Sequence, residues 1–593
     1  MKKRPRVWRP RPVSPRLAGE LADKVGVSNV TAQILVNRGV QDAESADRFL
    51  HPKLSHLEEP SLMADIGAAA ARIRAALGGR QRILIFGDYD VDGVTSSALL
   101  FRLLTLCGAD CEVYLPSRLE EGYGLSAAAT GEILRRAPDL VVTVDCGIGS
   151  AKETVALQAA GVDVIITDHH PVEGDLPPAL AVVDPKRPDC PYPFKQLAGV
   201  GVSFKLAWEV ARGLSRSKRV SPELRRFLLD SLGLVALGTV ADVVPLVGEN
   251  RVLVNYGLDV VASGRSAGLA ALMDVSGLGG GGLTSRDVAF RLGPRLNAAG
   301  RTGRPDDAIE LLLEEDAGRA GDLAAKLDRA NRERQRIEER IVREAMACPE
   351  VADESRASIV LGSDGWHAGV VGIVASRLVE RTGRPAVVVA FAADEGRGSA
   401  RSVPGVDVGR AVEECRDVLV SQGGHAAAAG VTVRRDRLDE FREAFERAVR
   451  SQLGGEAPAP VLGLDAEVLP EELTLRLAQE IETLAPFGEG NPVPVLASRG
   501  FTLDGDMRPL GNGKHYQLSV ACPPASGEAA AGGPGARLRA VAFGYGDRRR
   551  ELEGLAWKSI DMAYEIQRSN WSGPAGFELS VKDLRAAGAG PAQ

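Results

Sequence analysis

Four apolar runs in the first half of the chain each end at acidic residues. The runs cover residues 83–86, 140–144, 162–167 and 234–240, and they lead into Asp88-Tyr89-Asp90-Val91-Asp92, Asp145, Asp168-His169-His170 and Asp242. Runs of this length, rich in Val, Ile and Leu, are typical of buried parallel strands. Because open α/β folds bind ligands at the carboxyl edge of such a sheet, we expect these acids to lie close together there.

The segments around these runs predict an α/β domain over residues 62–265. Thr95-Ser96-Ser97 before an Ala/Leu stretch indicates the start of a helix. Residues 111–116 have the composition of a further strand. Strands that alternate with helices in this way favour a mostly parallel sheet.

The rest of the chain divides where its pattern changes. Short helical patterns over residues 1–61 predict a helical cap behind a basic N-terminus. The connecting region 266–352 contains a predicted long helix over 307–347, with apolar residues at helical spacing. A smaller α/β domain is predicted over 353–452, and short β-like runs over 461–593 predict a small barrel.

Two parts of this outline leave alternatives open. The basic N-terminal residues form either a solvated tail or a nucleic-acid contact, and Trp8 could instead pack on the next domain. The aromatic residues of the predicted barrel either stack on bases or fill its core; they are Tyr516, Phe543, Tyr545, Tyr564 and Trp571.

Composition indicates a globular, multidomain protein. The 593 residues are 45% hydrophobic, which is enough for several cores. No apolar run approaches the roughly 18 residues that a membrane span needs, and no apolar segment follows the basic start. The seven cysteines lack C-x-x-C spacing. We therefore expect a cytoplasmic protein that is neither exported nor bound to a membrane.

Charge and acid clustering bear on the chemistry. A net charge of −7 argues against a polyanionic partner, but cations bound among the acids would reverse the local sign. One Asp-rich turn is ordinary loop chemistry, whereas four acid-terminated runs favour a divalent-cation site. Carboxylates with histidine suit Mn²⁺ or Mg²⁺, and a pair of such ions supports phosphodiester hydrolysis.

The acid-bearing segments carry a family resemblance. Gly87–Ser96, Val144–Gly147, Thr167–His170 and Gly238–Pro245 resemble the four motifs of the DHH phosphoesterases. The resemblance to the RecJ family of bacterial single-strand-specific exonucleases extends further, through Gly293–Arg301, Trp366–Val374, Gly398–Ser402 and Gly423–Gly430. It implies a parallel-sheet DHH domain, a long connecting helix, a DHH-associated domain and an OB-like barrel.

The resemblance also implies a ligand set for two divalent cations. Asp145 would bridge them, Asp92, His169 and Asp242 would complete one site, and Asp90 would serve the other. His170 would contact the scissile phosphate. Many DHH phosphoesterases carry a histidine where this chain has Phe86, and we expect Asp88 or water to take that place.

Further family positions imply contacts to the substrate. Arg118, Ser399 and Arg401 would bind a 5′-terminal phosphate, and His425 a phosphate near the cleavage site. Asn297 and Arg301 are weaker candidates, because Gly-Pro-Arg turns are also common structural loops.

The function implied is a single-stranded-DNA-specific 5′→3′ exonuclease of DNA repair and recombination. A single-stranded-DNA-binding protein is an expected partner. The alternatives are a DHH phosphodiesterase of short oligonucleotides or cyclic dinucleotides, and a non-catalytic DNA-binding scaffold. The predicted barrel argues against the first alternative, and the intact acids argue against the second.

Overall fold

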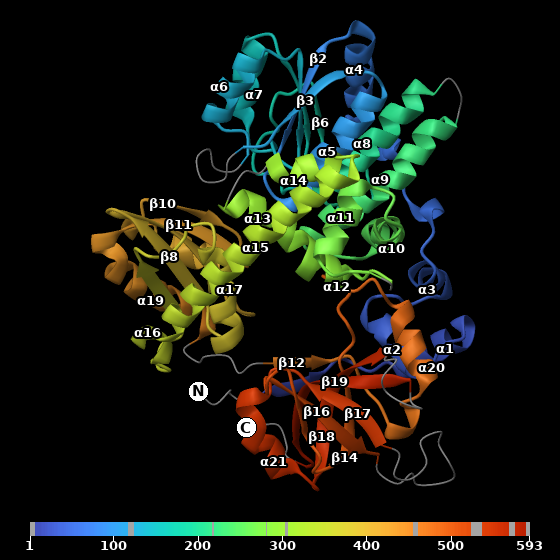
Figure 1. The fold of residues 1–593 in the computed structure, drawn as a ribbon, viewed down its shortest axis with the longest axis vertical. Coiled ribbons are helices and arrows are strands. Elements are labelled where there is room, and N and C mark those ends of the chain that lie inside the picture. The colour runs from blue at the N-terminus through green and yellow to red at the C-terminus, as the bar shows by residue number, and fades with distance from the viewer. Residues whose placement is uncertain are drawn as a thin grey trace. The chain divides into compact units, whose positions relative to one another are not determined.

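The protein is described by a computed structural model of residues 6–116, 124–215, 219–279, 282–302, 306–454, 461–522, 537–568 and 576–588 (Figure 1). The chain divides into two compact units. Unit 1 combines residues 1–58, 243–255 and 459–593, and unit 2 combines residues 59–242 and 256–458. The five predicted segments are distributed over these two units.

Unit 2 contains the predicted parallel sheet. Its strands lie in the order β3-β2-β4-β5-β6, and all neighbours are parallel. They are β2 (Arg82–Gly87), β3 (Asp110–Tyr114), β4 (Leu140–Val144), β5 (Asp163–Thr167) and β6 (Ala181–Val183). Every residue of β4 is buried, as expected for a central strand covered on both faces.

Helices cover both faces of this sheet. One hydrophobic cluster joins residues of α6 (Ala127–Arg136) and α7 (Ala151–Ala159) to one face. On the other side lie α4 (Ile66–Gly79), α5 (Val91–Leu106) and α8 (Gly199–Leu214), as Figure 1 shows.

The fourth apolar run, residues 234–240, is helical, so its prediction as a strand was wrong. It forms the end of α9 (Pro222–Ala241), which packs against α5 and α8. Ser221 caps this helix by accepting a hydrogen bond from the Leu224 N–H. A fully buried helix and a buried strand give the same continuous apolar run, so periodicity cannot separate them.

The helix predicted from Thr95 begins earlier. Asp90 is the N-cap of α5, and its carboxylate accepts hydrogen bonds from the Asp92 and Gly93 N–H groups. The acidic motif is therefore part of the first helical turn.

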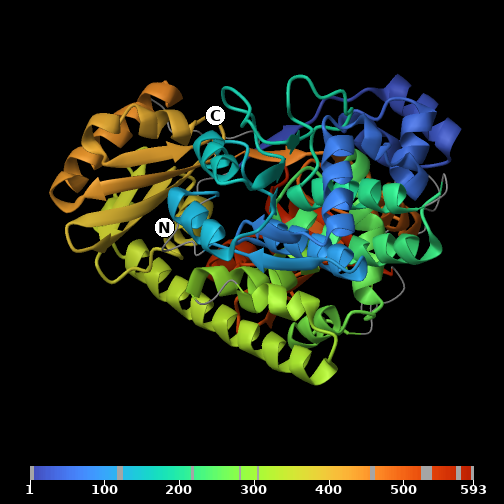
Figure 2. The same cartoon turned by 90° about the horizontal axis from the view of Figure 1, so that it is seen from above.

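The connecting region is helical almost throughout. After α10 (Gly248–Ala262), it contains α11 (Ala267–Val275), α12 (Ser285–Asp287), the π-helical turn η3 (Val288–Leu292) and α13 (Gly293–Thr302). The helix predicted over 307–347 is two helices, α14 (Asp306–Leu313) and α15 (Ala317–Met346). Asp316 caps α15 by accepting from the Arg319 N–H, and Figure 2 shows α15 as one unbroken helix.

The smaller α/β domain of unit 2 has a sheet in the order β10-β11-β9-β8-β7. Its elements are β7 (Ile359–Ser363), α17 (Val371–Thr382), β8 (Ala386–Ala392), β9 (Glu395–Arg401), α18 (Val408–Glu413), β10 (Ser421–Gly424), β11 (Ala428–Arg434) and α19 (Leu438–Leu453), preceded by α16 (Pro349–Ala352). Strand β9 was not predicted, because glycines and charged residues replace the usual apolar alternation.

Unit 1 contains the predicted barrel. Its strands are β13 (Ala466–Glu467), β14 (Leu496–Leu503), β15 (Arg508–Leu510), β16 (His515–Ala521), β17 (Arg537–Ala542), β18 (Ser559–Arg568) and β19 (Phe577–Ala586). They form one sheet, and an extra pairing of β14 with β16 closes it. Helices α20 (Leu475–Thr483) and α21 (Arg549–Leu555) flank the strands.

The N-terminal helices belong to the same unit as the barrel. Helices α1 (Pro15–Val25), α2 (Asn29–Asn37) and α3 (Ala43–Leu50) share a single hydrophobic core with it. Strand β1 (Val7–Pro10) pairs in parallel with β12 (Val461–Leu464). The Trp8 indole N–H donates to Asp583 Oδ2 at 2.9 Å, so Trp8 packs on a folded domain.

Most of the barrel's aromatic candidates are core residues. Tyr516, Tyr545 and Tyr564 are buried, whereas the Phe543 side chain is 54% exposed. Trp571 lies outside the described residues.

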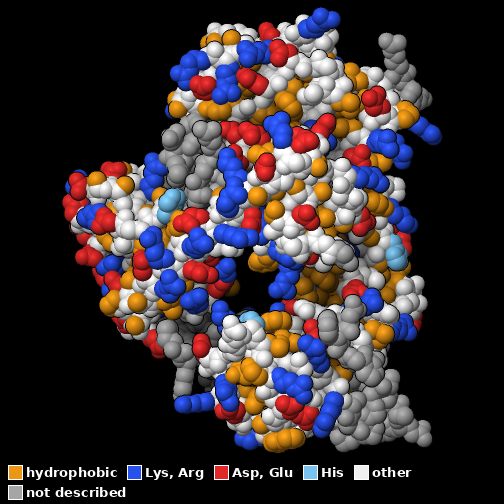
Figure 3. All heavy atoms as spheres, viewed as in Figure 1, with side chains coloured by type: hydrophobic (Ala, Val, Ile, Leu, Met, Phe, Trp, Pro, Cys, Tyr) orange, Lys and Arg blue, Asp and Glu red, His pale blue; other side chains and the backbone are white. Residues whose placement is uncertain are grey.

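On the face drawn in Figure 3, basic and acidic side chains are interspersed. Among the described residues, no helix combines the length and apolarity that crossing a membrane requires.

Candidate metal centre

The ends of β2, β4 and β5 bring together the predicted acidic and histidine residues. Asp88 follows β2, Asp145 follows β4, and Asp168-His169-His170 follows β5. Asp145 has a backbone φ of +60°, a left-handed conformation that is unusual for a residue other than glycine. Its N–H donates to the Thr167 carbonyl at 3.0 Å, which fixes it beside the end of β5.

Asp92 is held by a second helix. It is buried in the first turn of α5, and its two carboxylate oxygens accept from Gly199 N–H at 2.7 Å and Val200 N–H at 2.8 Å. These donors are at the N-terminus of α8, where the helix dipole favours a negative charge.

His169 lies among three carboxylates. Its Nε2 atom is 3.0 Å from Asp145 Oδ1, 3.6 Å from Asp242 Oδ2 and 3.8 Å from Asp92 Oδ2. Burial, then the charge of His170, lowers the pKa of His169 to about 3. The ring is therefore neutral near pH 7, the form that binds metals.

The side chains form three overlapping groups whose candidate ligand atoms lie within 4.8 Å of one another. They are Asp92 with His169 and Asp242, Asp88 with Asp90 and Asp145, and Asp145 with His169 and His170. Asp145 joins the Asp88 group to the histidines. The structure thus brings together all seven residues predicted as catalytic.

Two observations, the buried ligand atoms without hydrogen bonds and the spacing between ligand atoms, fit these groups to divalent cations. Among the described residues, Asp145 Oδ1, Asp242 Oδ2 and His169 Nε2 are buried and make no hydrogen bond. Adjacent ligands of an octahedral ion at about 2.1 Å are about 3 Å apart, which matches the spacing of His169 Nε2 and Asp145 Oδ1. Buried polar atoms of this kind require a partner, and a cation supplies one.

The acids repel one another strongly without a cation. Burial, then the charge of Asp90, raises the pKa of Asp92 to about 7. Burial, then the charges of Asp92 and Asp90, raises the pKa of Asp242 to about 9. The pKa of Asp145 is also raised well above its ordinary value by burial and by Asp92. Protons and cations therefore compete for the same oxygens.

Asp168, which the sequence places among the strand-end acids but not among the predicted metal ligands, positions the two histidines. Its Oδ1 accepts from the His169 N–H at 2.7 Å and lies 2.7 Å from His170 Nδ1, and its Oδ2 accepts from the Ile148 N–H at 2.9 Å. Although burial opposes it, this carboxylate raises the pKa of His170. Its position directly before the two histidines was the sequence feature that could have indicated this role.

Phe86 points into the core rather than toward the acids. It is fully buried, and its ring packs edge-on against Tyr114 with centroids 5.4 Å apart. Asp88, the residue expected to take that ligand position, lies with Asp90 and Asp145.

Two predicted phosphate contacts meet at a helix N-terminus. An Arg401 guanidinium N–H donates to Ser399 Oγ at 2.7 Å on β9. A Cβ atom built on Gly372, in the first turn of α17, would lie 3.1 Å from Ser399 Oγ and 3.1 Å from Arg401. A helix N-terminus beside an arginine and a hydroxyl is suited to an anion.

The remaining substrate candidates are more scattered. His425 is exposed between β10 and β11, and Asn297 is half-buried on α13. Arg118 and the side chain of Arg301 lie outside the described residues.

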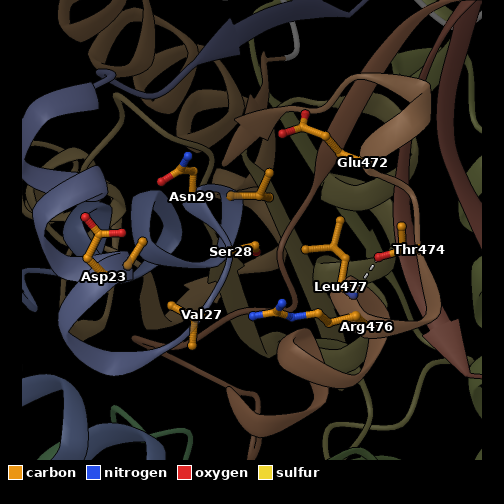
Figure 4. A pocket seen from close by; sticks show the side chains of 10 residues that line it. Asp23, Val27, Ser28, Asn29, Glu472, Thr474, Arg476 and Leu477 are labelled. Carbon is orange, nitrogen blue, oxygen red and sulfur yellow. Dashed lines mark hydrogen bonds between the residues drawn. The ribbon is translucent and has the colours of Figure 1, made fainter. Parts of the chain in front are cut away.

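A pocket of about 360 Å³ lies in unit 1 rather than at the acids (Figure 4). Its polar lining includes Ser28 and Thr474, which cap α2 and α20. Thr474 Oγ1 accepts from the Leu477 N–H at 3.2 Å. Both hydroxyls are occupied in capping, and none of the predicted site residues lines this pocket.

Comparisons with known proteins agree with this architecture. Family models match residues 82–239 (DHH family, N-terminal domain), residues 356–451 (DHHA1 domain) and residues 464–583 (RecJ OB domain). The single-stranded-DNA-specific exonuclease RecJ of Bacillus subtilis is 37% identical over 95% of this chain and 69% of its own length. That of Dickeya dadantii is 36% identical over 93% of this chain and 95% of its own.

A solved structure is similar throughout. The crystal structure of RecJ in complex with Mn²⁺ from Thermus thermophilus matches with a TM-score of 0.80 at 31% identity, covering 99% of this chain and 81% of that one. Both the fold and the sequence therefore support the same assignment: the chain belongs to the RecJ family of the DHH superfamily.

Proposed function

We propose that this chain hydrolyses single-stranded DNA from its 5′ end with the help of two divalent cations, Mn²⁺ or Mg²⁺. The observation that carries the proposal is the pair of ligand groups linked through Asp145 and His169. The relatives named above are single-stranded-DNA-specific exonucleases, and the matched structure contains Mn²⁺.

Each side chain of the centre has a proposed role. Asp145 would be shared between the cations, Asp92, His169 and Asp242 would hold one, and Asp90 with Asp88 would hold the other. When bound, such a pair of cations activates a water and stabilises charge on the attacking and leaving oxygens. His170, held by Asp168, donates a hydrogen bond to the phosphate under attack.

The proposed 5′ polarity rests on the phosphate-binding groups. Ser399, Arg401 and the N-terminus of α17 would bind the terminal phosphate, together with Arg118. His425 would contact a phosphate near the cleavage site, and Asn297 and Arg301 would contact the DNA. A nuclease that needs a terminal phosphate in place works from that end.

The proposal extends to the cell. The seven cysteines are free thiols, which suits the reducing cytosol. There the enzyme would act in DNA repair and recombination, on strands delivered by a single-stranded-DNA-binding protein.

End-labelled DNA tests the proposal. Strands labelled at the 5′ or the 3′ end are incubated with Mn²⁺, with Mg²⁺ and with chelator, beside a dinucleotide. We expect nucleotides from the 5′ end, no product with chelator, and a loss of more than about 100-fold in Asp145→Asn. The exposed Asp175→Asn variant is the matched control.

The other outcomes separate the alternatives. Cleavage of the dinucleotide alone would identify an oligonucleotide phosphodiesterase. Binding of the long strand without cleavage under any metal condition would identify a scaffold.

A further inference from the structure

The segment 285–302 lies against two stretches of chain that carry proposed metal ligands, but it supplies none of those ligands. A Cβ atom on Gly293 would be 3.7 Å from the Cβ of Ala241, the neighbour of Asp242. A Cβ atom on Gly300 would be 3.1 Å from the carbonyl oxygen of Tyr89, between Asp88 and Asp90. The segment therefore borders two of the chain stretches that carry the metal ligands.

Two arginines of this segment, Arg291 and Arg295, have structural roles. Arg295 donates to Asp328 at 3.0 Å and to the Arg291 carbonyl at 2.7 Å. Arg291 donates to the carbonyls of Ser276 and Gly277, just past the end of α11. These bonds tie the segment to α11 and α15 and hold it in place.

On this anchored segment one aromatic ring is directed to solvent. Phe290 is 71% exposed, whereas Val288 and Leu292 on either side of it are fully buried. The three residues belong to η3, a π-helical turn. Such turns are rare, and they occur frequently at functional sites.

A basic residue lies one helical turn before Phe290 in the sequence. Arg286 is exposed and precedes Phe290 by four residues. Residues four apart on a helical segment lie on the same side. Basic side chains that follow the backbone, together with aromatic rings on which bases stack, are how proteins bind single-stranded nucleic acid without base specificity.

We propose that Phe290 stacks on a base of the bound strand beside the metal centre, and that Arg286 contacts an adjacent phosphate. The inference rests on the proposed function and adds a positioning residue to it. A scattered apolar residue on a surface needs no explanation, but an exposed ring on a π-helical turn, three residues before Gly293 in a segment that borders the metal-ligand stretches, does. Stacking there would fix the strand's position relative to the cations without selecting a sequence.

Strands with a single abasic position test the stacking. A set of single strands is prepared in which the abasic position moves one nucleotide at a time from the 5′ end. Affinity is measured by fluorescence anisotropy in chelator, and first-nucleotide release is measured with Mn²⁺. In the wild type, one abasic position should weaken binding by about 10-fold.

The variants make the test specific. Phe290→Ala should bind the unmodified strand about 10-fold more weakly and lose its sensitivity to that abasic position. Phe290→Trp should retain both properties, and Phe290→Leu should behave like Ala. Arg286→Ala should lower the slope of log affinity against log salt by about 1.

The control is Leu106→Ala, which removes a 45% exposed apolar side chain at the far end of α5, about 20 Å along the helix from Asp92. An abasic profile that is the same in Phe290→Ala and the wild type overturns the inference and leaves the proposed function intact. A wild type that neither binds nor cleaves the strands overturns both.

Discussion

At the scale of single residues, the metal centre depends on the close approach of the α8 backbone to the Asp145 side chain. Asp145 adopts a strained backbone conformation, and such strain persists at functional sites when the surroundings over-determine it. One of those surroundings is the first residue of α8, Gly199. A Cβ atom there would lie 2.7 Å from Asp145 Oδ1 and 2.8 Å from its Cβ.

Gly199→Ala should therefore inactivate the enzyme without unfolding it. The added methyl group displaces Asp145, and a misplacement of about 1 Å costs about 100-fold in rate. We expect kcat/KM on single-stranded DNA to fall by that factor while the far-ultraviolet circular dichroism spectrum is retained.

Gly131→Ala on α6 is the matched control for this prediction. A Cβ atom at Gly131 meets nothing within 4 Å. That change should leave activity intact and stabilise the fold by up to about 1 kcal/mol. Equal activity of the two variants would refute the close-approach argument.

At the scale of elements, the sequence predicted which residues gather at the centre better than it predicted the elements that carry them. Strands β2, β4 and β5 follow from their apolar runs, whereas the run before Asp242 is a helix. The motif residues came together all the same, because α9 ends beside α5. Strand β9, which carries Ser399 and Arg401, escaped prediction because its glycines leave no apolar pattern.

The N-terminus of α17 gives a prediction at this scale. Gly372→Ala would place a methyl group 3.1 Å from Ser399 Oγ and Arg401, where the terminal phosphate is proposed to bind. The variant should lose most of the preference for a 5′-phosphorylated strand over a 5′-hydroxyl strand, measured as a ratio of kcat/KM values.

Gly365→Ala nearby, where an added Cβ meets nothing within 4 Å, should keep the wild-type ratio. An unchanged ratio in Gly372→Ala would remove α17 from the proposed phosphate site.

At the scale of the whole molecule, the acids of the metal centre link stability to pH. The raised pKa values of Asp92, about 7, and Asp242, about 9, mean that the folded state holds protons which the unfolded state releases near pH 4. The stabilisation is complete below pH 4 and is lost as pH rises through these values.

In chelator, the melting temperature should fall between pH 6 and pH 9. With Mn²⁺ the carboxylates are ionised and paired, so the fall should shrink or disappear. Differential scanning fluorimetry from pH 6 to pH 9, in chelator and with Mn²⁺, checks both expectations. Asp242→Asn should lose the part of the decline above pH 8, and a flat profile in chelator would contradict the prediction.

The shared core of unit 1 has a consequence for how the protein is made. The ribosome delivers α1, α2 and α3 first, but the barrel strands that cover Leu21, Ile34 and Leu35 come last. These apolar side chains remain exposed to solvent through almost the whole of translation. A chain that is truncated before the barrel strands never buries them. Nascent and truncated chains therefore expose a hydrophobic surface that chaperones and proteases bind. Binding to this surface distinguishes an incomplete chain from a complete one.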